Sequence, residues 1–121
     1  IKADTLEHST AGSLDTQYVV QGSAKAWMHM PNGGAGTISI SDSLNTSSIA
    51  DGGTGIYTPS WTNSMSNATY EASLATQRGA SFADHPTLNS MATGSMQMAQ
   101  SNASAYVNSA MYVASIHGDL A

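Results

Sequence analysis

In the segment Ala24-Lys25-Ala26-Trp27-Met28-His29-Met30, two kinds of side chain alternate along the chain. Successive side chains of a β-strand point to opposite faces. Such a strand would place Lys25, Trp27 and His29 on one face, and the apolar residues between them, Ala26, Met28 and Met30, on the other. The segment therefore predicts a half-buried strand whose apolar face contributes to a core.

Short β-branched, aromatic or alternating segments recur on both sides of this strand. We expect further strands at residues 17–21, 37–41, 47–50, 56–61, 69–78, 95–99 and 111–117. Ile38 and Ile40 are expected to face inward, and glycine clusters at 33–36 and 52–55 are expected to form turns. Pro59 cannot donate to a ladder, so the strand at 56–61 should lie at a sheet edge or be broken there. Residues 63–68 and 79–93 lack a pattern and are expected to be loops, and a short helix within 92–110 stays an alternative.

Many short strands separated by Gly, Asn and Pro are typical of two-layer β proteins. The predicted fold class is therefore all-β, with a small β-sandwich or jelly-roll-like domain over residues 16–121. Residues 1–15 show no alternation of period two. We expect them to form an extended N-terminal arm or linker that docks onto a partner.

Charged residues make up only 9% of the 121 residues, against about 25% in a typical protein. The net charge is −5, and the only Lys and Arg residues are Lys2, Lys25 and Arg78. Nucleic acid and anionic membranes are disfavoured as partners because both require clusters of cations. A surface with few charges offers little repulsion between copies, which favours a homo-oligomer.

The chain has four histidines, of which His29 and His117 fall in predicted strands. No Asp or Glu lies at a supporting short spacing, so we expect no metal site. Met28, Met30, Met96 and Met98 alternate along strands and are expected in a core or a subunit interface. The sequence has no cysteine and therefore neither a disulfide nor a thiolate metal site.

Catalytic patterns are weak throughout the sequence. The glycine clusters lack the Lys-Ser/Thr of a phosphate-binding loop. Ser81 lacks the flanking glycines of a nucleophile elbow, Asp84 and His85 are direct neighbours, and Glu71 is not obviously paired with a second acid. We therefore expect neither catalytic residues nor a cofactor.

The candidate binding residues are Arg78, Phe82 and His85, which frame the least patterned loop. Loops on a rigid β scaffold often carry binding function. A cation, an aromatic ring and polar neighbours would suit a sugar or a protein surface.

Several motifs occur in the order found in a family of small β domains from phage and prophage tail-fibre-like proteins. The segment Gly22-Ser23-Ala24-Lys25-Ala26-Trp27 resembles its opening, residues 42–58 resemble its central block, Met65 and Tyr70 match later positions, and residues 113–121 resemble its closing strand. Ile1-Lys2-Ala3-Asp4-Thr5 resembles the start of members from marine phages. Leu44 and Trp61 stand where the family usually has Phe.

The resemblance implies a virion structural protein of a tailed bacteriophage, a tail-fibre or adhesion-type module, located in the virion and trimeric. Its arm would contact other virion proteins, and its loops a host-surface glycan or protein. A capsid decoration protein is the alternative, followed by a fragment of a carbohydrate-active depolymerase.

Overall fold

The computed structural model of the chain describes residues 3–31, 38–77 and 85–121. Ten strands and one helix lie in these residues. The strands of the main domain are β3 (Ala24–Met30), β4 (Asp42–Leu44), β5 (Thr46–Asp51), β6 (Ile56–Trp61), β7 (Glu71–Gln77), β8 (His85–Ala92), β9 (Ser95–Ser101) and β10 (Met111–His117). An N-terminal segment precedes them, made of β1 (Thr5–His8), β2 (Gly12–Asp15) and α1 (Thr16–Gly22).

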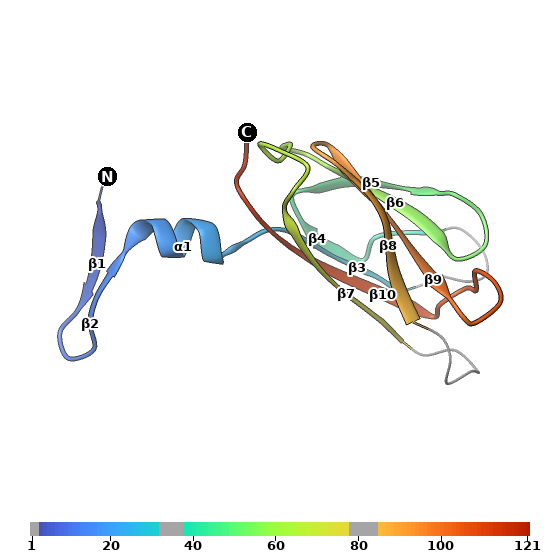
Figure 1. Cartoon of the computed structure of the whole chain (residues 1–121), viewed down its shortest axis with the longest axis horizontal. Helices are drawn as coiled ribbons and strands as arrows, with labels where there is room; N and C mark the ends of the chain where they lie inside the picture. Colours follow the sequence, from blue (N-terminus) through green and yellow to red (C-terminus); the bar gives the residue numbers. More distant parts are fainter. Residues whose placement is uncertain (1–2, 32–37, 78–84) are drawn as a thin grey trace.

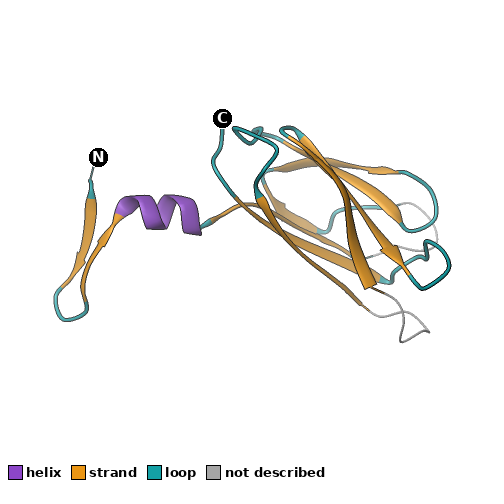
Figure 2. Cartoon of the chain, in the orientation of Figure 1, coloured by secondary structure: helices purple, strands orange, loops and turns teal. Residues whose placement is uncertain are grey.

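The main domain is a β-sandwich of two four-stranded sheets (Figure 1). The first sheet has the order β4-β3-β10-β7, and the second has the order β5-β6-β9-β8. All strand pairs in both sheets are antiparallel. The chain is almost wholly β outside one short helix (Figure 2), so the predicted fold class is confirmed.

The alternation that predicted β3 is present in its burial. Ala26, Met28 and Met30 are buried, whereas the residues between them are only partly buried. β10 shows the same pattern, with Tyr112, Ala114 and Ile116 facing inward, and it pairs with β3 along its length. These two central strands therefore supply most of one wall of the core.

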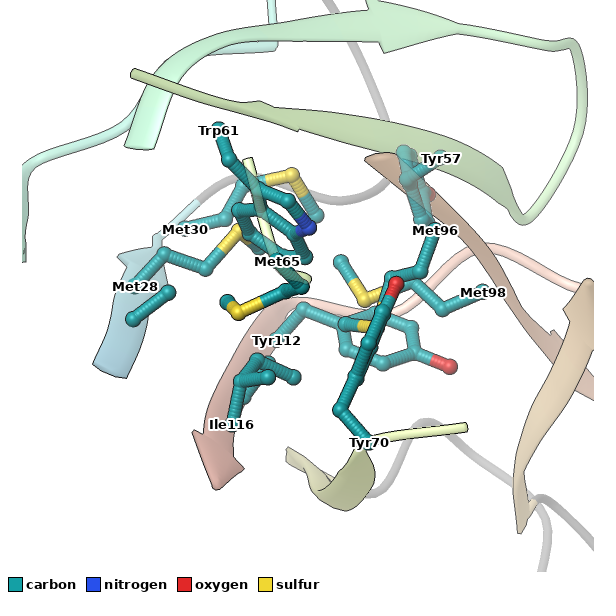
Figure 3. Packing of buried hydrophobic residues seen from close by; sticks show 12 residues of the cluster. Met28, Met30, Tyr57, Trp61, Met65, Tyr70, Met96, Met98, Tyr112 and Ile116 are labelled. Carbon is teal, nitrogen blue, oxygen red and sulfur yellow. The ribbon is translucent and has the colours of Figure 1, made fainter. Parts of the chain in front are cut away.

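The core between the sheets is rich in sulfur and aromatic side chains (Figure 3). Met28, Met30, Met96 and Met98 are all buried inside one protomer. The expectation that these methionines lie in a core or a subunit interface is thus resolved in favour of the core. Tyr57 meets Tyr112 edge-on at 5.6 Å between ring centroids, and Trp61 meets Tyr70 edge-on at 6.4 Å.

The predicted strand at 17–21 is wrong, because these residues form α1. In the described part of the chain this segment pairs with no strand, and its backbone groups bond to each other within the helix instead. The Thr16 N–H and hydroxyl both donate to the Asp4 carbonyl, at 2.8 and 3.0 Å, which fixes the start of the helix against the hairpin.

Three further expectations need correction. Residues 85–92 form β8 rather than a loop. Residues 38–41 do not form a strand, although Ile38 and Ile40 pack against the core as expected. β6 is not an edge strand, because it lies between β5 and β9.

The expected break at Pro59 is observed within β6. β9 pairs with Ile56, Tyr57 and Ser60 but with neither residue 58 nor 59. Pro59 is nevertheless buried, with its ring in the core. The missing N–H is thus accommodated by a local gap in the ladder rather than by a place at the edge.

Candidate functional site

The predicted loop site is only partly within the described residues. Arg78 and Phe82 lie outside them. His85 is the exposed first residue of β8, and its Nε2 lies 3.2 Å from the Ser101 hydroxyl. The grouping of Arg78, Phe82 and His85 therefore stays a prediction, with His85 placed at the end of a sheet.

The two strand histidines are held apart by the register of the first sheet. His29 is opposite Val113 on β10, whereas His117 is opposite Ala24 at the other end of the pair. His29 Nδ1 lies 2.5 Å from the Ser41 hydroxyl. Within residues 3–31, 38–77 and 85–121, His, Asp and Glu side chains form no group of three or more that could hold a metal ion.

The second candidate surface is the N-terminal arm, defined here as residues 3–22. Its hairpin pairs Leu6 with Leu14, so both leucines lie on one face. Leu6 is 51% exposed and Leu14 is 47% exposed, and on α1 Tyr18 and Val20 are 59% and 56% exposed. None of the arm residues whose burial the structure describes is buried.

The root of the arm is anchored to the sandwich through the last turn of α1. The Lys25 ammonium donates to the carbonyls of Val20 and of Ser23, the latter at 3.1 Å. His117 Nδ1 lies 3.1 Å from the Gly22 carbonyl. The last carbonyls of a helix lack partners within the helix, so a cation and an imidazole from the first sheet fix the point where the arm leaves. Figure 1 shows the hairpin projecting away from the sandwich beyond this point.

The outer face of the first sheet carries Trp27 at its centre, and we call it the Trp27 face. Leu44 on β4 and Ser115 on β10 lie directly opposite Trp27 on its two sides. Polar side chains around it are already paired: the Ser115 hydroxyl lies 3.2 Å from His117 Nε2, and the Ser73 hydroxyl donates to Glu71 at 2.7 Å. This face mixes one large aromatic ring with charged and neutral polar groups.

The outer face of the second sheet has a different chemistry. Most of its cross-strand partners are uncharged and lack a large apolar group, namely Ser48, Ala50, Thr58, Ser60, Ser90, Ala92, Ser95 and Gln97. Ile56 is the exception: it lies opposite Ala99, on the other side of β6 from the buried Tyr57. This face therefore combines neutral hydrogen-bonding groups with one partly buried apolar side chain.

The described tyrosines of the core are poor acids. Burial raises the pKa of Tyr57, Tyr70 and Tyr112 above the ordinary value of 10.0. The Tyr112 hydroxyl donates to the Ala99 carbonyl, and that of Tyr70 donates to the carbonyls of Ala92 and Ser95 at 3.1 and 2.9 Å. These groups connect the two sheets and stay neutral at ordinary pH, so their role is structural.

The exposed leucines of the arm were missed by reasoning from the sequence. Their signal was available in hindsight: two segments of four residues, Thr5–His8 and Gly12–Asp15, each contain a leucine, and the second begins at Gly12, whose φ is +90. The positive φ is the conformation that glycine adopts most readily, and it turns the chain into a hairpin.

No family model, no curated protein and no solved structure matches this chain. In the part of the chain that the structure describes, no helix has the length and apolar character needed to cross a membrane. The N-terminal arm, the Trp27 face and the outer face of the second sheet are therefore the surfaces on which a proposal of function can rest.

Proposed function

We propose that the chain is a bacteriophage virion structural protein, a tail-fibre or adhesion-type module that acts by oligomeric attachment. The observation that carries this proposal is the division of the chain into a packed sandwich and an arm in which no residue of described burial is buried. The motif resemblance of residues 22–70 and 113–121 adds the phage setting.

The arm is built to contact something outside its own protomer. An isolated two-stranded hairpin is marginally stable in water, and a helix shorter than about 12 residues is marginal as well. The arm consists of one such hairpin and one seven-residue helix. Its exposed leucines and the exposed Tyr18 and Val20 would be covered in an assembly.

The sandwich is suited to display. Binding by uncharged groups depends little on ionic strength, because screening acts on charges. Most cross-strand partners on the outer face of the second sheet are uncharged. Copies joined in a homotrimer would present several such faces at once. Weak contacts repeated over many copies then give tight attachment to a host-surface glycan or protein.

The first experiment measures the mass of the full chain by light scattering over a range of dilutions. A trimer is expected, and a stable folded monomer at every concentration would contradict the proposal. The second experiment labels the chain on intact particles and locates it by electron microscopy. Label on the tail fibres is expected, label over the capsid would replace the assignment by capsid decoration, and particles without label would overturn a virion role.

A further inference from the structure

The four edge strands of the sandwich are protected to different degrees. Exposed edges invite pairing with other chains, and proteins guard them with short strands, bulges, prolines and charges. β4 has only three residues and carries Asp42. β5 has a register shift between Thr46 and Ser48 and ends at Asp51. β8 contains Pro86 and has a register shift between Leu88 and Ser90.

β7 is the exception among the described edges. It runs for seven residues and pairs with β10 at every one of them without a shift. It contains neither proline nor glycine, and its only charged residue is Glu71 at its first position. Its inward-facing Ala72 and Leu74 are only partly buried, although their neighbours Ile116 and Ala114 on β10 are buried. Within residues 3–31, 38–77 and 85–121, β7 thus has a strand partner on one side only, and the apolar side chains Ala72 and Leu74 beside its other edge are partly exposed.

The hairpin β1–β2 exposes an apolar face that a neighbouring sheet could cover. Leu6 and Leu14 form an apolar pair on one face, while Glu7 and Ser13 are opposite each other on the other face. This alternation is typical of strands in a sheet with one buried face. Among the described residues, β1 and β2 pair only with each other, and Figure 1 shows them on the far side of α1 from β7.

We propose that the hairpin β1–β2 of one copy adds to the free edge of β7 of a second copy. The sheet would continue from β7 into the hairpin, with Leu6 and Leu14 covering the open side of the core beside Leu74. Glu7 and Ser13 would then lie on the same outer face as Ser73 and Ala75. This inference rests on the oligomer of the proposed function and assigns its contact.

Charge disfavours β4 as the acceptor. The arm carries the acidic residues Asp4, Glu7 and Asp15. Like charges directly opposite each other destabilise a strand pair. Asp42 is one of only three residues in β4, whereas the one carboxylate of β7, Glu71, lies at its first position and the other six residues are uncharged. The register shifts of β5 and β8 distinguish these two edges from β7. A head-to-tail contact of this kind closes into a ring when its rotation allows it, as a trimer requires.

The chain contains no cysteine, so any disulfide that forms in a variant must involve the introduced cysteines. Two sets of full-length variants are prepared, one with Glu7→Cys or Ser13→Cys in the hairpin, the other with Ser73→Cys, Ala75→Cys or Gln77→Cys in β7. Each hairpin variant is mixed with each β7 variant under oxidising conditions. Ser48→Cys, on the guarded β5 edge, is the matched control. Paired strands bring opposite Cβ atoms about 4.5–5.5 Å apart, close to what a disulfide spans.

We expect a disulfide-linked dimer from at least one hairpin–β7 mixture, at a yield at least about tenfold above that of the Ser48→Cys mixtures. Chains that remain oligomeric by light scattering without this cross-link would overturn the inference and leave the proposed function standing. Monomeric chains without the cross-link would overturn both. Dimers formed by Ala75→Cys alone at the same yield would show that β7 pairs with β7, which also overturns it.

A charged substitution on the acceptor edge gives a second test. Ala75→Glu places a carboxylate on the face of β7 that would receive Glu7 of the acidic hairpin, and like charges on paired strands destabilise the pairing. It should shift the mass of the full chain from oligomer to monomer, with an unchanged far-ultraviolet circular dichroism spectrum. Ser48→Glu is the control and should leave the mass unchanged. An Ala75→Glu chain that stays folded and fully oligomeric would contradict the proposed contact.

Discussion

Gly55 lies at a point where three backbone segments converge. Its φ is +67, its N–H donates to the Asn108 side chain at 2.7 Å, and its carbonyl accepts from the Gln100 N–H at 2.9 Å. A Cβ at this position would lie 2.3 Å from the Val107 carbonyl oxygen and 2.9 Å from that of Gln100. Both neighbours are backbone atoms, which cannot move aside as a flexible side chain can.

Gly55→Ala is therefore expected to lower the free energy of unfolding by about 3 kcal/mol or more, since it combines left-handed strain with a backbone clash. Gly53→Ala is the control, because Gly53 also has a positive φ of +105 but nothing within 4 Å of the added Cβ. It should cost about 1–2 kcal/mol from strain alone. Guanidinium unfolding followed by tryptophan fluorescence measures both, and equal losses would refute the clash.

The buried tyrosines make stability depend on alkaline pH. Because burial raises the pKa of Tyr57, Tyr70 and Tyr112 in the folded chain, the unfolded chain loses these protons first. The unfolded state then binds fewer protons, so the free energy of unfolding falls as pH rises above about 10. Each tyrosine contributes a slope of up to about 1.4 kcal/mol per pH unit.

Unfolding titrations at several pH values from neutrality to above 10 test this expectation. The free energy of unfolding should stay level up to the ordinary tyrosine pKa and then drop. Tyr70→Phe should reduce the slope, because it removes one of the buried hydroxyls whose pKa is raised. A profile that is flat throughout would argue against the buried placement of these hydroxyls.

At the scale of the element, β9 alternates between buried and partly buried residues at its start, and one of its buried residues is polar. Met96 and Met98 face the core and Gln97 faces out, but Gln100 continues the inward series and is fully buried. Neither amide atom of Gln100 has a hydrogen-bond partner among the described residues. An unpaired buried polar group costs about 1–3 kcal/mol.

Gln100→Met should therefore raise the free energy of unfolding by about 1–2 kcal/mol, because it keeps the length of the side chain and removes the unpaired amide. Gln97→Met, three residues earlier on the outer face, is the matched control and should change stability by less than about 0.5 kcal/mol. Thermal unfolding of the two variants compares them, and a destabilised Gln100→Met chain would mean that the amide is paired.

Strands with a clear alternation were predictable from the sequence, and so were β5 and β6 despite their local irregularities, whereas β8 was not. β3 and β10 were expected with the bounds that the structure shows, because their inward residues keep strict period two. β8 was missed because the register shift between Leu88 and Ser90 moves its side chains out of phase. Helix α1 was missed because its β-branched residues favour a strand, whereas in the described part of the chain this segment pairs with no strand.

The candidate site was less predictable than the fold. We selected Arg78, Phe82 and His85 because their segment lacks a pattern. Of the three, only His85 lies among the described residues, as the first residue of β8. The exposed Leu6 and Leu14 carry information only once they are known to be opposite each other, which depends on the hairpin register. The register of a hairpin is a property of the folded chain, and a segment of four residues contains too little pattern to predict it.

At the scale of the whole molecule, the packed sandwich and the exposed arm should differ in local stability. Amides in regions with few buried contacts exchange by local opening. At dilutions where light scattering shows a monomer, amides of residues 5–22 should exchange orders of magnitude faster than those of β9 and β10. In the oligomer the arm should become protected, and hydrogen–deuterium exchange with mass spectrometry measures both states. Equally slow exchange of arm and β10 in the monomer would contradict a partner-dependent arm.

The thioether side chains of the core have a consequence for chemical ageing. Met28, Met30, Met65, Met96 and Met98 are at most 2% exposed, so peroxide can reach them only when the sandwich opens. Conversion to the polar sulfoxide would then keep the chain from closing again, since such a group disrupts an apolar core. The partly exposed Met91 and Met111 should oxidise first, and the buried five should follow together at the rate of opening. The sulfoxide content of the buried five would thus record how often the sandwich had opened during storage.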